Sequence, residues 1–283
     1  MRIVVTGGSG KAGRWVVRDL RVHGHEVLSV DLLPDGSPHG EFVLVDLTDL
    51  GQCHETVAGA DAVVHLAAIP ADRIRPAGET FRNNTLSTYN VFAAAADRGV
   101  PRIVWASSET VLGLPFDEPP AFAPIDETHP PRPESSYALS KLVGETMAEQ
   151  FARRTAARFV GLRISNIMEP ADYQRFPGWQ ADASLRKWNL WGYVDARDVA
   201  QAVRLSLDAP VDAAEVFIVA AADTCMRRDS AALMAESYPD VELRRPLEGR
   251  ETLLSIDRAR TRLGYAPGHS WIGPGGLGEE DPR

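Results

Sequence analysis

Thr6-Gly7-Gly8-Ser9-Gly10-Lys11-Ala12-Gly13 joins an apolar run at the N-terminus to an amphipathic stretch. The glycine spacing predicts a strand–turn–helix unit, in which Gly7 permits a tight turn, Gly10 lets backbone approach a pyrophosphate and Gly13 lets the helix pack on the strand. The N-terminus of such a helix offers free N–H groups and a partial positive charge to phosphates. The alternative is that these glycines only form turns.

The end of the second predicted strand carries a carboxylate, Asp31. A carboxylate at this place can accept both ribose hydroxyls of NAD and repels the 2′-phosphate of NADP. Ser9 and Lys11 lie in the glycine loop and are further candidate contacts to the cofactor. Lys11 and Arg14 could each reach a phosphate, which keeps NADP open as an alternative to the favoured NAD.

Two later strand ends complete the predicted cofactor site. Asp46 and Leu47 follow the third strand, where the carboxylate would lie near an adenine amino group, although it could equally cap the next helix. Leu66 and Ala67 follow the fourth strand and are compact enough for a cofactor to approach closely. His65 is interpreted as a packed histidine rather than a catalyst.

Short apolar runs alternate with amphipathic stretches along most of the chain, a pattern typical of parallel strands covered on both faces. The predicted strands are Arg2–Thr6, Glu26–Asp31, Glu41–Asp46, Asp61–Leu66, Arg102–Ala106, Phe159–Ser165 and Glu215–Ala220. The predicted helices are Ala12–His23, Asp49–Ala58, Asn84–Arg98, Ser136–Arg154 and Ala196–Leu207. The fold is therefore predicted to be α/β, a doubly wound parallel (Rossmann-like) sheet with a small, discontinuous C-terminal substrate-binding cap.

Three segments depart from the alternation. Leu114–Glu134 is rich in proline and is predicted to be a long irregular loop, a kind of segment that is usually functional. Met168–Trp191 has weak periodicity, and Gly268–Arg283 is rich in glycine and proline and is predicted to be loose. The predicted division is a dinucleotide-binding domain at 1–167, a cap segment at 168–192, a return to the first domain at 193–222, and a small substrate-side region with the tail at 223–283.

Composition excludes several classes of protein. The 283 residues include 30 basic and 39 acidic side chains, a formal net charge of −9, which disfavours nucleic acid as a partner. The apolar runs are far shorter than the ~20 residues that span a bilayer. Met1–Thr6 leads into the first predicted strand without a charged and then apolar stretch, so secretion is not expected. Cys53 and Cys225 stand alone, which favours a reduced, cytoplasmic protein without a structural disulfide or zinc site.

Tyr137 and Lys141 lie four residues apart at the start of a predicted helix, hence on one face. A phenol is a poor base at neutral pH, but a nearby ammonium and the positive ring of an oxidised nicotinamide both favour its phenolate. Such a pair can take a proton from a hydroxyl while hydride moves to the nicotinamide. Ser108 ends the fifth predicted strand, at the sheet edge where ligands collect, and would hold the substrate oxygen. Alone, the Tyr–Lys spacing also fits an ordinary surface pair.

In combination the motifs resemble the extended short-chain dehydrogenase/reductases, the NAD-dependent epimerase/dehydratase family, over roughly residues 1–265. The resemblance is carried by the glycine loop, Asp31, Ser107-Ser108-Glu109-Thr110-Val111-Leu112-Gly113, the Tyr137–Lys141 pair and Trp191-Gly192-Tyr193-Val194-Asp195-Ala196-Arg197-Asp198-Val199-Ala200. It implies an NAD-dependent enzyme of the predicted fold.

The resemblance also implies roles for individual residues. Ser108 is expected to hydrogen-bond the substrate, Tyr137 to be the general acid/base, and Lys141 to bind the ribose hydroxyls and lower the pKa of Tyr137. Asn84 is expected near the active site, because its stretch is similar to the family's N-x-x-G-T-x-N helix start. Leu112 departs from the family pattern by replacing a tyrosine, and Glu109 departs by adding a negative charge.

The cap is short for this family. Only 25 residues, Ile167–Trp191, fill the place where nucleotide-sugar enzymes have a long segment, which favours a small substrate. The cap and the chain length resemble those of uronate dehydrogenases, which oxidise the anomeric hydroxyl of a free hexuronic acid to a lactone. That resemblance implies that Arg175 holds the substrate carboxylate through a two-pronged hydrogen bond. The alternative is a surface arginine. Glu109 and Asn166 are further candidate substrate contacts.

The favoured function is an NAD-dependent oxidoreductase that oxidises a hydroxyl of a small free sugar, sugar acid or polyol by hydride transfer. One alternative is a nucleotide-sugar epimerase or dehydratase that recycles NAD within the site. An alternative of another class is a non-catalytic NAD-binding sensor or scaffold. The apolar residues on helices 84–98 and 136–154 allow a homodimer through these helices, or only core packing.

Overall fold

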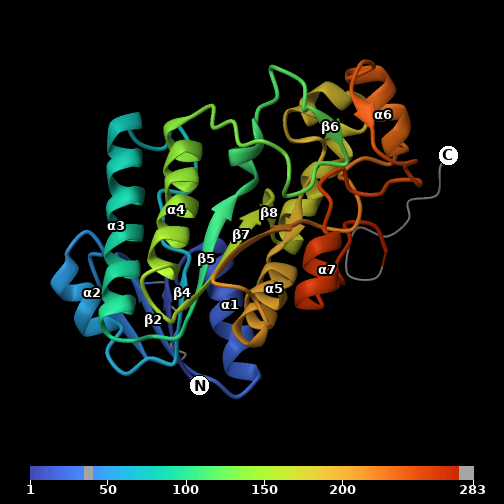
Figure 1. Cartoon of the computed structure of the whole chain (residues 1–283). Helices are drawn as coiled ribbons and strands as arrows, with labels where there is room; N and C mark the ends of the chain where they lie inside the picture. Colours follow the sequence, from blue (N-terminus) through green and yellow to red (C-terminus); the bar gives the residue numbers. More distant parts are fainter. Residues whose placement is uncertain (35–40, 274–283) are drawn as a thin grey trace.

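A parallel seven-stranded sheet in the order β10-β7-β5-β4-β1-β2-β3 forms the centre of the protein (Figure 1). The computed structural model describes residues 1–34 and 41–273. The sheet strands are β1 Arg2–Thr6, β2 Glu26–Asp31, β3 Phe42–Leu44, β4 Ala62–His65, β5 Arg102–Ser108, β7 Arg158–Ile164 and β10 Ala214–Val219. The helices are α1 Lys11–Val22, α2 Leu50–Thr56, α3 Ala77–Asp97, α4 Ser136–Ala152, α5 Ala196–Asp208, α6 Ser230–Ser237 and α7 Asp257–Leu263. The predicted α/β fold is confirmed.

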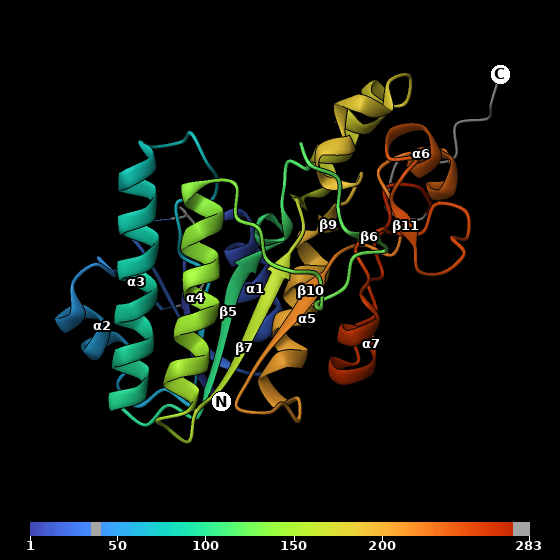
Figure 2. The same ribbon diagram turned by 45° about the horizontal axis from the view of Figure 1, so that its top comes forward.

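The two faces of the sheet are buried in separate cores because side chains alternate along each strand. Ile3 and Val5 of β1 pack in the core that α1 and α5 cover, whereas Val4 packs in the core that α2, α3 and α4 cover. Figure 2 shows α3 and α4 together on one face of the sheet and α1 and α5 on the other. Both faces are therefore dry, which explains why the strands read as continuous apolar runs.

The long loop between β5 and α4 is tied to the C-terminal region. Within the predicted irregular segment Leu114–Glu134, β6 (Phe122–Ala123) pairs in parallel with β11 (Glu242–Leu243). Ile125 also bridges to Leu254. The loop is thus ordered in part by residues more than a hundred positions away, which no local pattern could indicate.

Two boundaries differ clearly from the prediction. α3 begins at Ala77 rather than Asn84, since its first turn is exposed and contains Gly78, so it carries no apolar stripe. The segment from Gly268 is not loose at first: Trp271 is fully buried, and His269 contacts Asp198 at 2.7 Å. The rest of the predicted tail, 274–283, lies outside the described residues. Within residues 1–34 and 41–273, none of the helices combines the length and the apolar character that crossing a bilayer requires.

Candidate active site

The glycine loop turns tightly at the end of β1. Gly7 has φ +71°, and a Cβ there would lie 2.5 Å from the backbone nitrogen of Ala67. A Cβ on Gly13 would lie 2.0 Å from the carbonyl oxygen of Gly7, so α1 can pack this closely only without a side chain. Gly10 is the residue before the first turn of α1. The loop therefore presents bare backbone and a helix N-terminus to one space, which suits a pyrophosphate.

A cavity of about 1200 Å³ extends from this loop across the carboxyl edge of the sheet. Most of the predicted cofactor residues line it, namely Gly7, Gly10, Lys11, Gly13, Asp31, Asp46, Leu47, Leu66 and Ala67. Ser108, Glu109, Tyr137, Lys141 and Asn166 line the same cavity. The predicted residues Ser9, Asn84 and Arg175 lie outside this lining. One continuous space thus joins the two groups of residues that the sequence analysis assigned to cofactor and substrate.

Asp31 is held in place by backbone. Its carboxylate accepts hydrogen bonds from the N–H groups of Ser9 (3.1 Å) and Leu32 (2.7 Å), so Ser9 orients the carboxylate rather than lining the cavity itself. Asp46 accepts from the N–H and hydroxyl of Thr48, and these bonds lower its pKa. The cap of the following helix is Asp49, not Asp46, because Asp49 accepts the N–H of Gln52.

Lys11 is paired with the cap. Its ammonium lies 2.7 Å from a carboxylate oxygen of Asp172. Arg14 pairs in the same way with Glu169, 3.1 Å away. In the structure the two cations predicted to reach phosphates thus join α1 to the cap.

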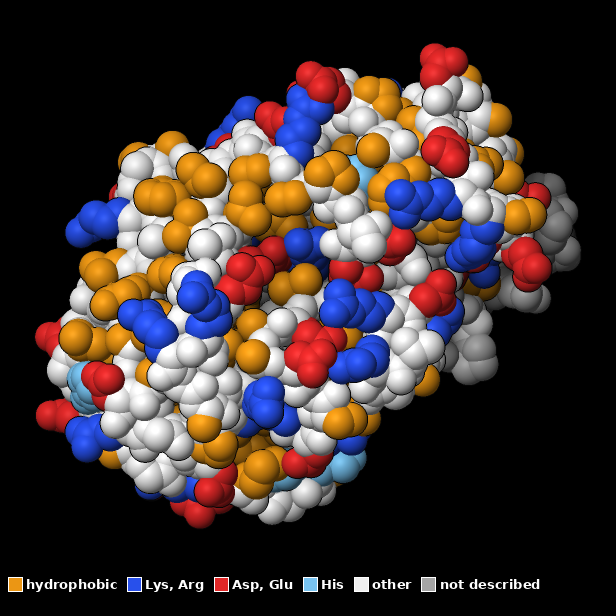
Figure 3. Space-filling model, in the orientation of Figure 1, with side chains coloured by type: hydrophobic (Ala, Val, Ile, Leu, Met, Phe, Trp, Pro, Cys, Tyr) orange, Lys and Arg blue, Asp and Glu red, His pale blue; other side chains and the backbone are white. Residues whose placement is uncertain are grey.

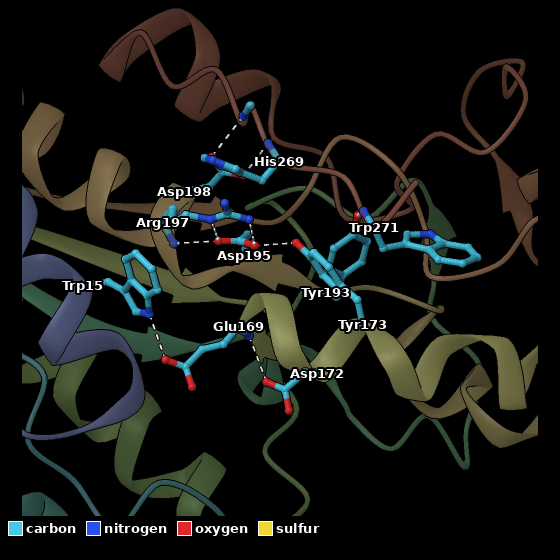
Figure 4. A network of polar contacts seen from close by, with 11 residues as sticks. Trp15, Glu169, Asp172, Tyr173, Tyr193, Asp195, Arg197, Asp198, His269 and Trp271 are labelled. Carbon is cyan, nitrogen blue, oxygen red and sulfur yellow. Dashed lines mark hydrogen bonds and ion pairs between the residues drawn. The ribbon is translucent and has the colours of Figure 1, made fainter. Parts of the chain in front are cut away.

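Figure 4 shows how the cap, Ile167–Trp191, is fastened to the sheet domain. Glu169 accepts a hydrogen bond from the indole N–H of Trp15 on α1 at 2.8 Å. The hydroxyl of Tyr173 donates to Asp195, which also receives two 2.8 Å bonds from Arg197 at the start of α5. Both anchors are buried or half-buried, so the wall above the cavity is fixed to α1 and α5.

Ser108, Tyr137 and Lys141 meet at the end of β5 and the start of α4. Burial raises the pKa of Tyr137 to about 12, a hydrogen bond with the Ser108 hydroxyl partly opposes this rise, and the charge of Glu109 adds to it. The Lys141 ammonium lies 5.6 Å from the centre of the Tyr137 ring and donates to the carbonyl of Ala106 at 2.8 Å. Burial lowers the pKa of Lys141 to about 8.

The pKa of Tyr137 thus lies above its usual value although the Lys141 ammonium is near, and the lowering of this pKa by Lys141 stays a prediction. Burial is the largest cause of the rise, and the ammonium lies 5.6 Å from the centre of the ring. A phenolate here needs a further positive charge close to the oxygen.

A buried ion pair fixes α4 against the sheet. Glu145 of α4 accepts two hydrogen bonds from Arg163 of β7, at 2.9 and 2.8 Å, and one from the Ser107 hydroxyl of β5 at 2.6 Å. Ser107 adjoins Ser108, and Glu145 lies one helical turn beyond Lys141. The pair thus sets the position of the Tyr–Lys helix relative to the serine.

Asn84 and His65 both hold neighbouring segments by hydrogen bonds. The buried side-chain amide of Asn84 accepts a hydrogen bond from the backbone N–H of Ile69 at 2.8 Å and donates one to the backbone carbonyl of Ile69 at 3.1 Å. Ile69 lines the cavity. Asn84 thus supports the loop that follows β4 without lining the cavity, and its expected catalytic role stays a prediction. His65 is buried between the hydroxyls of Thr6 and Thr88, as expected for a packed histidine.

Arg175 does not reach the cavity. Its side chain is 65% exposed and lies 3.8 Å from Asp172 on the outer side of the cap. The surface alternative holds because Pro170–Trp179 coils into a short helix that turns this residue outward.

A different arginine, Arg186, lies behind the cavity residue Asn166. It is buried, and its two terminal nitrogens donate to the side-chain oxygen of Asn166 at 3.2 and 3.1 Å. Its guanidinium also stacks over the rings of Trp179 and Trp188, 4.5 and 4.9 Å from their centres. Arg186 was not predicted as a site residue. The nearby Trp188 and Trp191 were the only signal in the sequence, and such aromatic residues occur in the hydrophobic core as well as beside a cavity.

Glu109 lines the cavity beside Ser108. Its carboxylate accepts from the Ser165 hydroxyl at 2.6 Å and from the Asn189 amide at 3.3 Å. Burial raises its pKa to about 7, although these bonds and the charge of Arg186 oppose the rise. Leu112, the other departure, is fully buried in the core and takes no place in the cavity lining.

Comparison with known proteins agrees with this geometry. The sequence model of the NAD dependent epimerase/dehydratase family matches residues 3–220. A uronate dehydrogenase of Pseudomonas syringae pv. tomato is 31% identical over 182 residues, 63% of this chain and 64% of that protein. A UDP-glucose 4-epimerase of Streptococcus mutans is 34% identical over 178 residues, 59% of this chain and 52% of that protein. These matches span less than two thirds of the relatives' length.

Solved structures share the fold over nearly the whole chain. A short-chain dehydrogenase/reductase superfamily protein from Agrobacterium tumefaciens, crystallised with bound NAD, superposes with a TM-score of 0.74 at 28% identity. The superposition covers 95% of this chain and 93% of that one.

Proposed function

This chain belongs to the NAD-dependent epimerase/dehydratase family, and on that premise we propose that it is an NAD-dependent dehydrogenase of a small free sugar or sugar acid. The observation that carries the proposal is that one continuous cavity is lined by the glycine loop and by Asp31, Ser108, Tyr137 and Lys141. The bare backbone of the loop and the carboxylate beyond it are the groups that NAD requires.

The proposed chemistry divides between the cofactor and the chain. NAD, when bound, supplies a hydride acceptor and a positively charged ring. The Ser108 hydroxyl and the Tyr137 oxygen hold the substrate's reacting hydroxyl, and Tyr137 takes its proton while hydride leaves the same carbon. The Lys141 ammonium, 5.6 Å from the Tyr137 ring centre, stabilises the phenolate alongside the ring of the cofactor.

The substrate end of the cavity supports a small, polar substrate. The cap that closes it is short, and its inner wall presents Asn166 with Arg186 directly behind. A guanidinium in this setting suits a carboxylate, directly or through Asn166. The uronate dehydrogenase likeness of the matched stretch supports the same substrate class.

The test is a panel of sugars, uronic acids, polyols and nucleotide sugars, mixed with the protein and NAD while absorbance of NADH is followed. We expect stoichiometric NADH with at least one free sugar or sugar acid. A UDP-sugar that is converted with no net NADH would instead identify an epimerase, the alternative that the Streptococcus mutans relative keeps open.

Asp31 is expected to set the preference for NAD. Asp31→Asn keeps the hydrogen bonds from backbone possible but removes the charge that repels a 2′-phosphate. The ratio of kcat/KM for NAD to that for NADP should fall by about tenfold to a hundredfold, equivalent to about 1.4–2.7 kcal/mol. Asp46→Asn, the same change at the neighbouring cavity carboxylate, is the control and should leave the ratio nearly unchanged.

The assembly and location are also proposed. Leu86 and Tyr89 of α3 and Leu139 of α4 are exposed, and Figure 3 shows hydrophobic side chains gathered over the face that these helices form. We infer a homodimer that buries this face. Light scattering, which measures the molar mass in solution, would reveal it. Both cysteines are free and buried, which fits the proposed cytoplasmic location.

A further inference from the structure

A carboxyl group stands where a sugar acid would have to bind. Glu109 is 3% exposed, adjoins Ser108 in the chain, and lines the cavity. Its oxygens accept hydrogen bonds from Ser165, Asn189 and the backbone of Asn166, and the charge of Arg186 acts on it without a direct ion pair. An ionised carboxylate held this way would repel a substrate anion across a poorly solvated space.

Arg186 and Glu109 share one neighbour, Asn189. The Asn189 amide donates to Glu109 at 3.3 Å, and its oxygen accepts from Arg186 at 3.4 Å. Arg186 thus faces Glu109 from the cap, while Tyr137 and Lys141 face the same space from α4. With Glu109 ionised, the charge of Arg186 is already balanced before any substrate arrives.

We propose that Glu109 takes up one proton whenever the site accepts an anionic sugar, and that this proton decides between sugar acids and neutral sugars. Protonation frees the charge of Arg186 for the substrate carboxylate. It also turns Glu109 from an acceptor into a donor beside the reacting carbon. The inference rests on the proposed function, since it concerns the substrate of that site.

The sign of the pH effect follows from linkage. A bound anion raises the pKa of Glu109 above its value of about 7 in the protein alone, so binding takes up a proton in the interval between the two values. Above about pH 7 the KM for a sugar acid should therefore rise about tenfold per pH unit, until the pKa of the complex is reached. The KM of a neutral sugar has no such rise, because it does not alter the charge around Glu109.

The kinetic experiment compares D-glucuronate with D-glucose, which differ at C6, between pH 6 and 9. We expect the KM for glucuronate alone to rise with pH in the unmodified protein. In Glu109→Gln this rise should disappear, and the KM for glucuronate at pH 9 should fall by at least about tenfold. Glu79→Gln, the same change at the exposed rim of the cavity, is the control and should keep the rise.

A binding measurement keeps the proposal testable if Glu109→Gln does not fold. Calorimetric titration of Tyr137→Phe, saturated with NAD, with glucuronate in two buffers of different ionisation enthalpy gives the protons taken up on binding. We expect uptake of a large fraction of one proton at pH 7.5 and none with glucose. Glucuronate binding without proton uptake would overturn the inference.

The outcomes separate the two proposals. NADH from glucuronate with a pH-independent KM refutes proton uptake but leaves the dehydrogenase intact. NADH from glucose but never from glucuronate has the same meaning, since the site then accepts no acid. If no member of the substrate panel yields NADH, the proposed function fails, and the inference fails with it.

Discussion

Replacing Tyr137 with phenylalanine is expected to lower kcat by about 10²–10⁴-fold, the usual contribution of a positioned acid–base group. The phenol lines the cavity beside Ser108, and phenylalanine in its place has no group that can accept the proton. Only one hydrogen bond to the cofactor is at stake, about 1.5 kcal/mol at most, so the dissociation constant of NAD should change by no more than about tenfold. Stopped-flow NADH formation and fluorescence titration with NAD measure the two quantities.

Tyr89→Phe is the matched control, because Tyr89 is an exposed phenol on α3 outside the cavity. It should keep the kcat of the unmodified protein. A Tyr137→Phe protein that turns over within about threefold of normal would exclude Tyr137 as the base. The role of Ser108 would then have to be assigned anew.

Glu145→Gln is expected to lower the free energy of unfolding by about 3–5 kcal/mol, because it leaves the buried charge of Arg163 without its partner. Urea denaturation at neutral pH measures the loss. The same change loosens α4 against β5, so kcat should fall as well, because Glu145 accepts a hydrogen bond from the cavity residue Ser107 although it does not line the cavity itself.

The double variant Glu145→Gln/Arg163→Met tests the cause. Removing both charges should recover much of the lost stability, since the penalty comes from an unpaired buried cation rather than from the missing attraction. Loss of stability that is equal in the single and double variants would show that packing, not charge, explains the effect.

How much of the fold the sequence predicts depends on how local each signal is. The strands of the sheet are covered on both faces, so their apolar runs stand out, and β1 and β2 were predicted to the residue. α3 was predicted to start too late, because its exposed first turn has no partner in the core. The pairing of β6 with β11 joins distant segments and has no local pattern.

In the candidate site, too, the features that depend on local sequence were predicted, and those that depend on contacts between distant segments were not. Gly7, Gly13 and the Tyr137–Lys141 spacing are backbone requirements of one turn and one helix face, and their geometry in the structure agrees with that origin. The rise in the pKa of Tyr137 was not predicted, since burial depends on every segment that surrounds the phenol. Arg175 was expected to face the substrate but lies exposed outside the cavity lining, because the charge and the spacing of an arginine do not indicate which way a coiled cap turns it.

The sequence by itself determined the doubly wound sheet, the glycine loop, Asp31 and the Tyr–Lys helix, since each follows from periodicity or from contacts within a few residues. Only the tertiary structure decided that Arg186 lies behind the cavity residue Asn166 while Arg175 lies exposed, and that Glu109 faces Arg186 across Asn189. Those relations join β5, the cap and the end of β7. Charge, burial and distance between separate segments exist only once the chain has packed.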